Sequence, residues 1–113
     1  MIYSVEKTEL YALLKVPEPE LRMSTVDYLE LVLAEAAEKE GHRNLLLDLG
    51  EVRFADTAAL RVIITAANRC RKAGGRVVLL NAHPPVQNVL RLGGVNIIKF
   101  AESVEEAEAL FES

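Results

Sequence analysis

The stretch LLLDLGEVRFADTAALRVIITAANRCRKAGGRVVLL, residues 45–80, decides the fold of this chain. It begins with the short apolar run Leu45–Leu49 and ends with a second one, Arg76–Leu80. Such runs are typical of strands that are covered on both faces, as in a parallel sheet. The segment Ala58–Ala73 between them is rich in good helix formers. The stretch therefore predicts two parallel strands joined by a right-handed helical crossover.

The expected helix has a clear apolar stripe and recognisable ends. Asp56 is suited to cap its first turn, because its carboxylate can accept hydrogen bonds from amides that lack a helical partner. Gly74 and Gly75 end the helix after a last turn that is rich in cations. The stripe expected to be buried consists of Leu60, Ile63, Ile64, Ala67 and Cys70.

Towards the N-terminus, the pattern predicts a hairpin and a helix. The strands Ile2–Glu6 and Leu10–Val16 are joined by a turn over Glu6–Glu9, and Pro17–Glu20 forms a loop because proline cannot donate to a sheet. Ser24-Thr25-Val26-Asp27 resembles a capping box with Asp in the place of Glu. The helix that follows buries Val26, Leu29, Val32 or Leu33, and Ala36, and ends at Gly41.

Towards the C-terminus, the pattern predicts two further helices, one before and one after a fifth strand in the sequence. Pro84-Pro85 opens the first of them, since proline at a helix start loses no hydrogen bond, and Gly93-Gly94 ends it. Val95–Phe100 is the strand, and Ser103 starts a last helix that buries Ala107, Leu110 and Phe111. The expected fold is an α/β domain: a mixed five-stranded sheet, with an N-terminal hairpin and parallel strands, and about four helices.

Size and charge exclude several classes of protein. A chain of 113 residues has the size of one ordinary domain, so we expect residues 1–113 to form a single domain. The 13 basic and 17 acidic residues give a net charge of -4 and are scattered, which argues against nucleic acid as a direct partner. No apolar stretch is long enough for membrane insertion and no export signal is visible, so we expect a cytoplasmic protein.

The sequence contains no recognisable enzyme motif, metal-ligand spacing or cofactor cradle, and we expect neither catalysis nor a cofactor. The single Cys70 cannot form an internal disulfide. His83 has no nucleophile or carboxylate beside it in sequence to make it a general base. The informative segment is Phe54–Leu60, where the expected sheet leads into a helix at the end where α/β proteins usually place their sites. From these residues alone, ordinary helix capping by Asp56 explains the segment.

The same segment resembles the signature of STAS domains, and in particular of the small stand-alone anti-sigma factor antagonists of bacteria. That signature is an apolar strand, a short loop, and Asp-Ser-(Ser, Thr or Ala)-Gly-Leu at a helix start. Here the strand Leu45–Leu49 and the loop containing Val52–Ala55 are followed by Asp56-Thr57-Ala58-Ala59-Leu60. Arg71–Leu79 and Val89–Val95 are similar to the family's continuation. The resemblance covers almost the whole chain and implies one STAS domain over residues 1–113.

The resemblance implies a function in partner switching. In the family, the hydroxyl residue after the Asp is phosphorylated by an anti-sigma factor that is also a serine-threonine kinase, and here that residue is Thr57. The unphosphorylated antagonist binds this kinase and so releases a sigma factor for transcription; a serine phosphatase resets the phosphorylated form. The residues implied in partner binding are Phe54, Asp56, Thr57, Ala58, Ala59 and Leu60.

Three positions depart from the family pattern. Ala59 stands where the family usually has Gly, which adds a methyl group where a kinase would approach the backbone. Thr57 stands in place of the commoner Ser. Arg22 stands where a carboxylate is often found near the phosphorylation site, so we hypothesise that Arg22 pairs with a phosphate on Thr57.

These departures keep two other functions open. STAS domains also serve as scaffold subunits of bacterial lipid-transport ABC systems, where a similar Asp-Thr-Ala-Gly-Leu occurs and supports subunit binding without phosphorylation. A third possibility is the sensing of a ligand or nucleotide at the start of the helix after Asp56, or an unrecognised enzyme activity.

Overall fold

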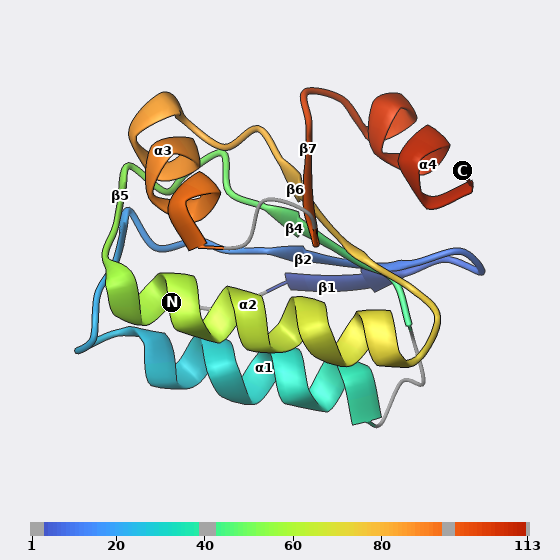
Figure 1. Cartoon of the computed structure of the whole chain (residues 1–113), viewed down its shortest axis with the longest axis horizontal. Coiled ribbons are helices and arrows are strands. Elements are labelled where there is room, and N and C mark those ends of the chain that lie inside the picture. Colours follow the sequence, from blue (N-terminus) through green and yellow to red (C-terminus); the bar gives the residue numbers. More distant parts are fainter. Residues whose placement is uncertain (1–3, 39–42, 94–96, 113) are drawn as a thin grey trace.

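The computed structural model describes residues 4–38, 43–93 and 97–112 (Figure 1). Its strands and helices alternate as the sequence predicts, with two additional short strands. The strands are β1 (Ser4–Lys7), β2 (Ala12–Lys15), β3 (Glu20–Leu21), β4 (Leu45–Asp48), β5 (Phe54–Ala55), β6 (Val77–Leu80) and β7 (Ile98–Ala101). The helices are α1 (Val26–Glu38), α2 (Thr57–Lys72), α3 (Pro84–Gly93) and α4 (Val104–Glu112).

The main sheet is mixed, with strand order β1-β2-β4-β6-β7. β1 and β2 form the antiparallel hairpin, in which Ser4 pairs with Lys15 and Lys7 with Ala12. The neighbours β2·β4, β4·β6 and β6·β7 are all parallel. The predicted α/β architecture of a five-stranded mixed sheet and four helices is therefore confirmed.

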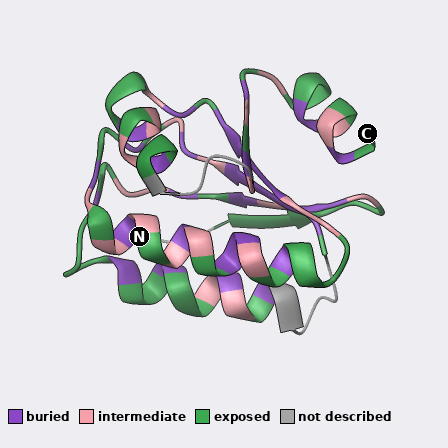
Figure 2. Cartoon of the chain, in the orientation of Figure 1, coloured by how far each residue is buried: buried purple, intermediate pink, exposed green. Residues whose placement is uncertain are grey.

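Helices cover the two faces of the sheet unequally. α1, α2 and α3 contribute to the larger core, which includes Leu29, Ile63 and Leu90 together with the alternate strand residues Leu45 and Leu47. Of the described helices, α4 covers the other face, where Ala107 and Phe111 pack on Leu46 and Val78. Figure 2 shows buried residues recurring between exposed ones along α1 and α2. The central strands β4 and β6 are buried because both of their faces are covered, as expected for parallel strands, whereas the edge strand β1 is exposed.

Several expected boundaries and burial patterns are corrected. β1 extends to Lys7, because Thr8 makes the turn: its hydroxyl accepts hydrogen bonds from the Leu10 and Tyr11 amides. On α2 the fully buried residues are Ala59, Ile63, Ala66, Ala67 and Cys70. Leu60 and Ile64, which were expected in this stripe, are only half-buried. The buried stripe of α2 therefore includes the small residues Ala59 and Ala66 in place of Leu60 and Ile64.

The largest correction concerns the two segments that were predicted as loops. Residues 50–55 and the segment after Pro17 contain β5 and β3, which pair in parallel as a separate two-stranded sheet. Two-residue strands have no periodicity, so they cannot be read from a sequence pattern. The predicted stops at Gly41 and Gly94 and the predicted start of the fifth strand at Val95 lie outside the described residues. Among the described helices, none is long and apolar enough to cross a membrane.

Candidate functional site

The start of α2 is fixed by the small β3·β5 sheet. Glu20 pairs with Phe54, and Leu21 pairs with Ala55. The Arg53 amide donates to the Pro19 carbonyl at 2.7 Å, and the Asp56 amide donates to the Leu21 carbonyl at 3.0 Å. The chain that enters α2 is thus bound along its length to a segment more than thirty residues earlier in the sequence. This pairing holds the sequence-predicted segment Phe54–Leu60 in a defined position.

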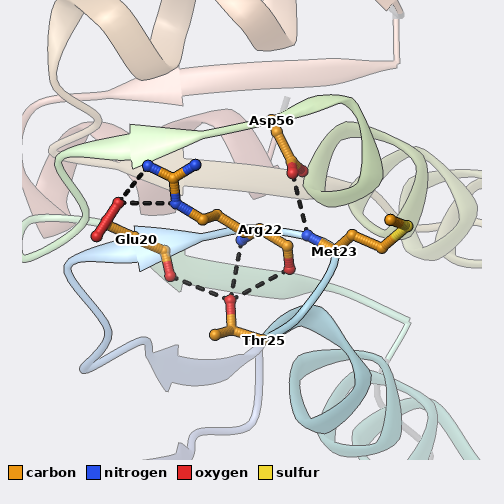
Figure 3. A network of polar contacts seen from close by, with 5 residues as sticks. All are labelled: Glu20, Arg22, Met23, Thr25 and Asp56. Carbon is orange, nitrogen blue, oxygen red and sulfur yellow. Dashed lines mark hydrogen bonds and ion pairs between the residues drawn. The ribbon is translucent and has the colours of Figure 1, made fainter.

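Asp56 caps α2, as predicted, and also holds a second segment. Its Oδ1 accepts hydrogen bonds from the Ala58 amide at 2.9 Å and the Ala59 amide at 3.2 Å. Its Oδ2 accepts a hydrogen bond from the Met23 amide at 3.0 Å (Figure 3). Met23 was not found by sequence reasoning, since its contribution is a main-chain N–H that any residue except proline carries. One carboxylate therefore joins the start of α2 to the loop before α1.

The pKa of Asp56 is lowered from its ordinary value. Desolvation acts to raise it, but the hydrogen bonds from the Ala59, Met23 and Ala58 amides and the nearby charge of Arg22 outweigh that effect. Hydrogen bonds to the charged form of an acid favour that form. Asp56 is thus an anion at neutral pH, with its oxygen atoms committed to three backbone amides.

Thr57 is the first residue of α2, and its side chain is exposed. It directly follows Asp56, whose carboxylate is hydrogen-bonded to three amides, at the positive end of a 16-residue helix. The Ala58 and Ala59 amides are already bound to Asp56, so they are not free for another anion, contrary to the simple picture of an open helix N-terminus. The site presents one accessible hydroxyl and one anion side by side.

Arg22 lies in the same neighbourhood, held by an acid and an aromatic ring. Its Nε and Nη2 atoms donate to Glu20 Oε2 at 2.8 and 2.5 Å, and its guanidinium carbon lies 4.3 Å from the centroid of the Phe54 ring. The Arg22 amide donates to Thr25 Oγ1 at 2.9 Å, which stiffens the loop before α1 (Figure 3). In place of a Ser24 and Asp27 box, the Thr25 hydroxyl makes the local contacts with Glu20 and Arg22. Arg22, which the sequence analysis selected for its charge, therefore packs on Phe54 beside Asp56.

The residues expected to bind a partner differ in their exposure. Phe54 is exposed, and Ala58 and Leu60 are half-buried. Ala59 is 0% exposed, so its methyl group fills the core instead of adding bulk at the surface. Met23, at 75% exposure, stands out as an apolar side chain beside the same site. The surface around Thr57 thus combines exposed apolar side chains with a few fixed charges.

The part of the chain that the structure describes places neither a metal-ligand cluster nor a reactive thiol at this site. Among the described residues, no group of three or more potential ligands lies together in a way that could hold a metal ion. Cys70 is buried on α2, and burial raises the pKa of its thiol to about 11, which keeps it protonated and unreactive. What the described residues present at the start of α2 is an accessible threonine beside a capping carboxylate.

Comparison with known families identifies the class. The family model of the STAS domain matches residues 4–107, and the chain belongs to the STAS domain family. BtrV of Bordetella bronchiseptica, named as a candidate anti-sigma factor antagonist, is 34% identical over 91 residues, covering 80% of this chain and 78% of that protein. An anti-sigma F factor antagonist of Paenibacillus polymyxa is 26% identical over 67% of this chain and 65% of its own.

Solved structures confirm the fold at low sequence identity. The unphosphorylated anti-sigma factor antagonist SpoIIAA has a TM-score of 0.74 at 16% identity, covering 96% of this chain and 94% of its own. A candidate anti-sigma factor antagonist from Thermotoga maritima has a TM-score of 0.82 at 21% identity, covering 98% and 95%. The resemblance of the sequence to the STAS family is therefore confirmed. The solved structures show that the fold of the described residues is also similar to that of anti-sigma factor antagonists.

Proposed function

We propose that this protein is an anti-sigma factor antagonist that binds an anti-sigma factor with serine-threonine kinase activity, and that phosphorylation of Thr57 regulates the binding. The observation that carries the proposal is the exposed Thr57 hydroxyl directly after Asp56 at the start of α2. The names of the Bordetella and Paenibacillus relatives support the same role. Sigma-factor-dependent transcription would then be controlled by protein binding alone, with catalysis left to the kinase and to a serine phosphatase.

The charge at the site explains how a phosphate would act as a switch. A phosphothreonine carries a charge of about -1.5 to -2 near neutral pH. On Thr57 it would lie beside the Asp56 anion. The Asp56 carboxylate cannot move away from the phosphate unless it breaks its hydrogen bonds to the amides of Met23, Ala58 and Ala59. Because the two nearest first-turn amides are occupied, the phosphate stays exposed on the surface. A partner packed on this surface would have to bury or approach that charge, and would be released.

The partner surface we propose is centred on Phe54, Asp56, Thr57, Ala58 and Leu60. Met23 joins this surface, because its backbone is bound to Asp56 and its side chain is largely exposed. Ala59 contributes through the core, where its burial fixes the first turn of α2. Exposed aromatic and methionine side chains are common anchors at protein interfaces.

Arg22 would respond to the phosphate. Its guanidinium now pairs with Glu20 and lies over Phe54, close enough to Asp56 to lower the pKa of that carboxyl. A doubly charged phosphate is a stronger acceptor than a single carboxylate, and Arg forms bidentate pairs with it. We therefore propose that Arg22 exchanges Glu20 for the phosphate and disturbs the Phe54 surface. Loss of the effect of phosphorylation in Arg22→Ala would support this exchange, and an unchanged switch would reject it.

The test is a pull-down from extract of the native cell with the wild-type protein, Thr57→Ala and Thr57→Glu, followed by intact-mass measurement of the recovered bait. Thr65→Ala is the matched control, since Thr65 is an exposed threonine further along α2 whose hydroxyl donates to the Arg61 carbonyl. We expect a kinase bound by the wild type and Thr65→Ala but not by Thr57→Glu. We also expect a phosphate mass on the wild type and Thr65→Ala that both Thr57 variants lack.

A different result would redirect the assignment. A bait that is never phosphorylated and recovers ABC transporter subunits through all washes, in the wild type and in Thr57→Glu alike, would overturn the switch. It would favour the scaffold function that the Asp-Thr-Ala-Ala-Leu sequence also allows.

A further inference from the structure

The connections that follow β6 and β7 leave the main sheet on opposite faces. α3, after β6, packs Val86 and Leu90 into the larger core. α4, after β7, packs Ala107 and Phe111 on the other face. Figure 1 shows the two helices diverging from the ends of these neighbouring strands. In open α/β sheets, a switch of this kind at the carboxyl ends of parallel strands opens a crevice in which ligands bind.

A hollow of about 500 Å³ lies at this position. Its volume is within the range of about 300 to 1,000 Å³ that is usual for small-molecule sites. Residues from the β6–α3 connection form one wall, and residues from β7 and α4 form the other. The lining includes Asn81, His83, Gln87, Arg91, Glu102 and Glu106.

The wall from α3 presents a fixed cation. The guanidinium carbon of Arg91 lies 4.5 Å from the centroid of the Phe100 ring, and its Nη2 lies 3.4 Å from Gln87 Oε1. Gln87 is itself held, because its side-chain amide donates to the Ala82 carbonyl at 2.8 Å. An arginine held by a ring and an amide keeps further N–H groups for a carboxylate.

The wall from α4 and the connection that precedes it presents two carboxylates. Glu102 and Glu106 are both exposed, and Glu106 Oε2 accepts a hydrogen bond from the Glu102 amide at 3.3 Å. This contact belongs to the cap of α4, so it fixes the position of Glu106 at the crevice. The two walls therefore carry opposite charges.

The crevice is poorly suited to a phosphate. α3 starts with Pro84 and Pro85, which have no N–H, and the Gln87 amide is already bound to the His83 carbonyl. The first turn of α4 carries Glu105 and Glu106, which repel an anion. The prolines remove amides from one helix start and the glutamates add negative charge to the other, so both differ from the helix starts with which α/β proteins usually hold phosphates.

We propose that this crevice binds a small zwitterionic molecule of the amino-acid class, with its carboxylate on Arg91 and its ammonium group on Glu102 and Glu106. The proposal is independent of the role of Thr57. A metabolite would then bind to the domain at the carboxyl ends of β6 and β7, where α3 and α4 diverge.

The test is a titration of the full chain, labelled with ¹⁵N, with each of the standard amino acids in turn at about 10 mM, a concentration that detects millimolar affinity. Propionate and propylamine, which each carry one of the two charges, are the matched control compounds, and inorganic phosphate is the third. We expect at least one amino acid to move the amide signals of Asn81, His83 and Glu102. We expect the three control compounds to leave those signals in place.

Variants then locate the binding. Arg91→Gln and Glu106→Gln should each weaken the affinity tenfold or more, while Arg61→Gln, an exposed arginine on α2, should not change it. Glu106→Gln keeps an acceptor for the Glu102 amide, so the cap of α4 is retained. The proposal fails if no amino acid moves these signals, if a control compound binds as well, or if Arg91→Gln binds with unchanged affinity.

Discussion

Among the described helices, α2 and α4 start with a side-chain cap, and the two caps differ in what they connect. At α4, the Ser103 hydroxyl accepts a hydrogen bond from the Glu106 amide at 3.1 Å, and Glu106 reaches back to the Glu102 amide. At α2, Asp56 caps the first turn and also holds Met23, 33 residues earlier in the chain. The first cap is local, and the second is a tertiary contact. A charge placed beside the second cap can therefore affect two segments at once.

The first residue after each cap sharpens this contrast. Thr57 of α2 and Val104 of α4 are both exposed, but only Thr57 carries a group that a kinase can modify. The first turn of α2 has no acidic side chain, whereas the first turn of α4 already carries Glu105 and Glu106.

The largest expected effect is on partner binding. Thr57→Glu should weaken the affinity for the proposed kinase by about 100-fold, since like charges at an interface cost several kcal/mol. Val104→Glu places the same side chain at the equivalent position of α4 and should leave the affinity unchanged. Calorimetry with the kinase recovered in the pull-down measures both. Equal losses in the two variants would contradict a site at α2.

The next effect is on stability. Ser103→Ala should lower the free energy of unfolding by about 1 kcal/mol, as expected for loss of a local cap. Asp56→Ala should lower it further, because it also releases the loop at Met23. Urea unfolding gives the two values, and hydrogen exchange should show that the Met23 amide loses protection only in Asp56→Ala. Retained protection of that amide would show that the tertiary contact does not form in solution.

The pH dependence of the two caps should differ as well. The pKa of Asp56 is lowered in the folded state, so its contribution to stability is fully present above its ordinary pKa and is lost as the pH falls through the lower, folded-state value. The stability difference between the wild type and Asp56→Asn should therefore shrink in acid. The difference for Ser103→Ala should change little, because a hydroxyl does not titrate there. Urea unfolding at a series of pH values from neutral to acid tests this.

The smallest effect concerns the long-range contact of α4. The Tyr11 hydroxyl donates to Glu108 Oε2 at 2.9 Å, and desolvation, followed by this bond, raises the pKa of Tyr11 to about 12. The contact favours the neutral phenol, so its contribution is complete below the ordinary tyrosine pKa and is lost as the pH rises towards 12. Tyr11→Phe should remove this alkaline loss of stability. Ultraviolet titration of the wild type and the variant follows the phenol directly, and an ordinary pKa for Tyr11 would contradict the contact.

The sequence predicted most of the main sheet and the helices, because their signals are local. The apolar runs at Leu45–Leu49 and Arg76–Leu80, the proline start of α3 and the Ser103 cap all act within a few residues. The cap at Asp56 was predicted for the same reason. The position of Thr57 as the candidate site came from family resemblance, since a capping Asp followed by Thr is common at helix starts.

The sequence by itself determined the order of the elements, the caps and the residue types at the start of α2. Only the tertiary structure decided that Glu20 and Phe54 pair, that Met23 binds Asp56, that Arg22 lies on Phe54, and that α3 and α4 diverge around a crevice. These contacts join main-chain groups or side chains that are far apart in the chain, and backbone amides carry no residue-specific signal. Neighbouring residues determine the caps and the strands, whereas the surface around Thr57 and the crevice between α3 and α4 form where segments distant in sequence come together.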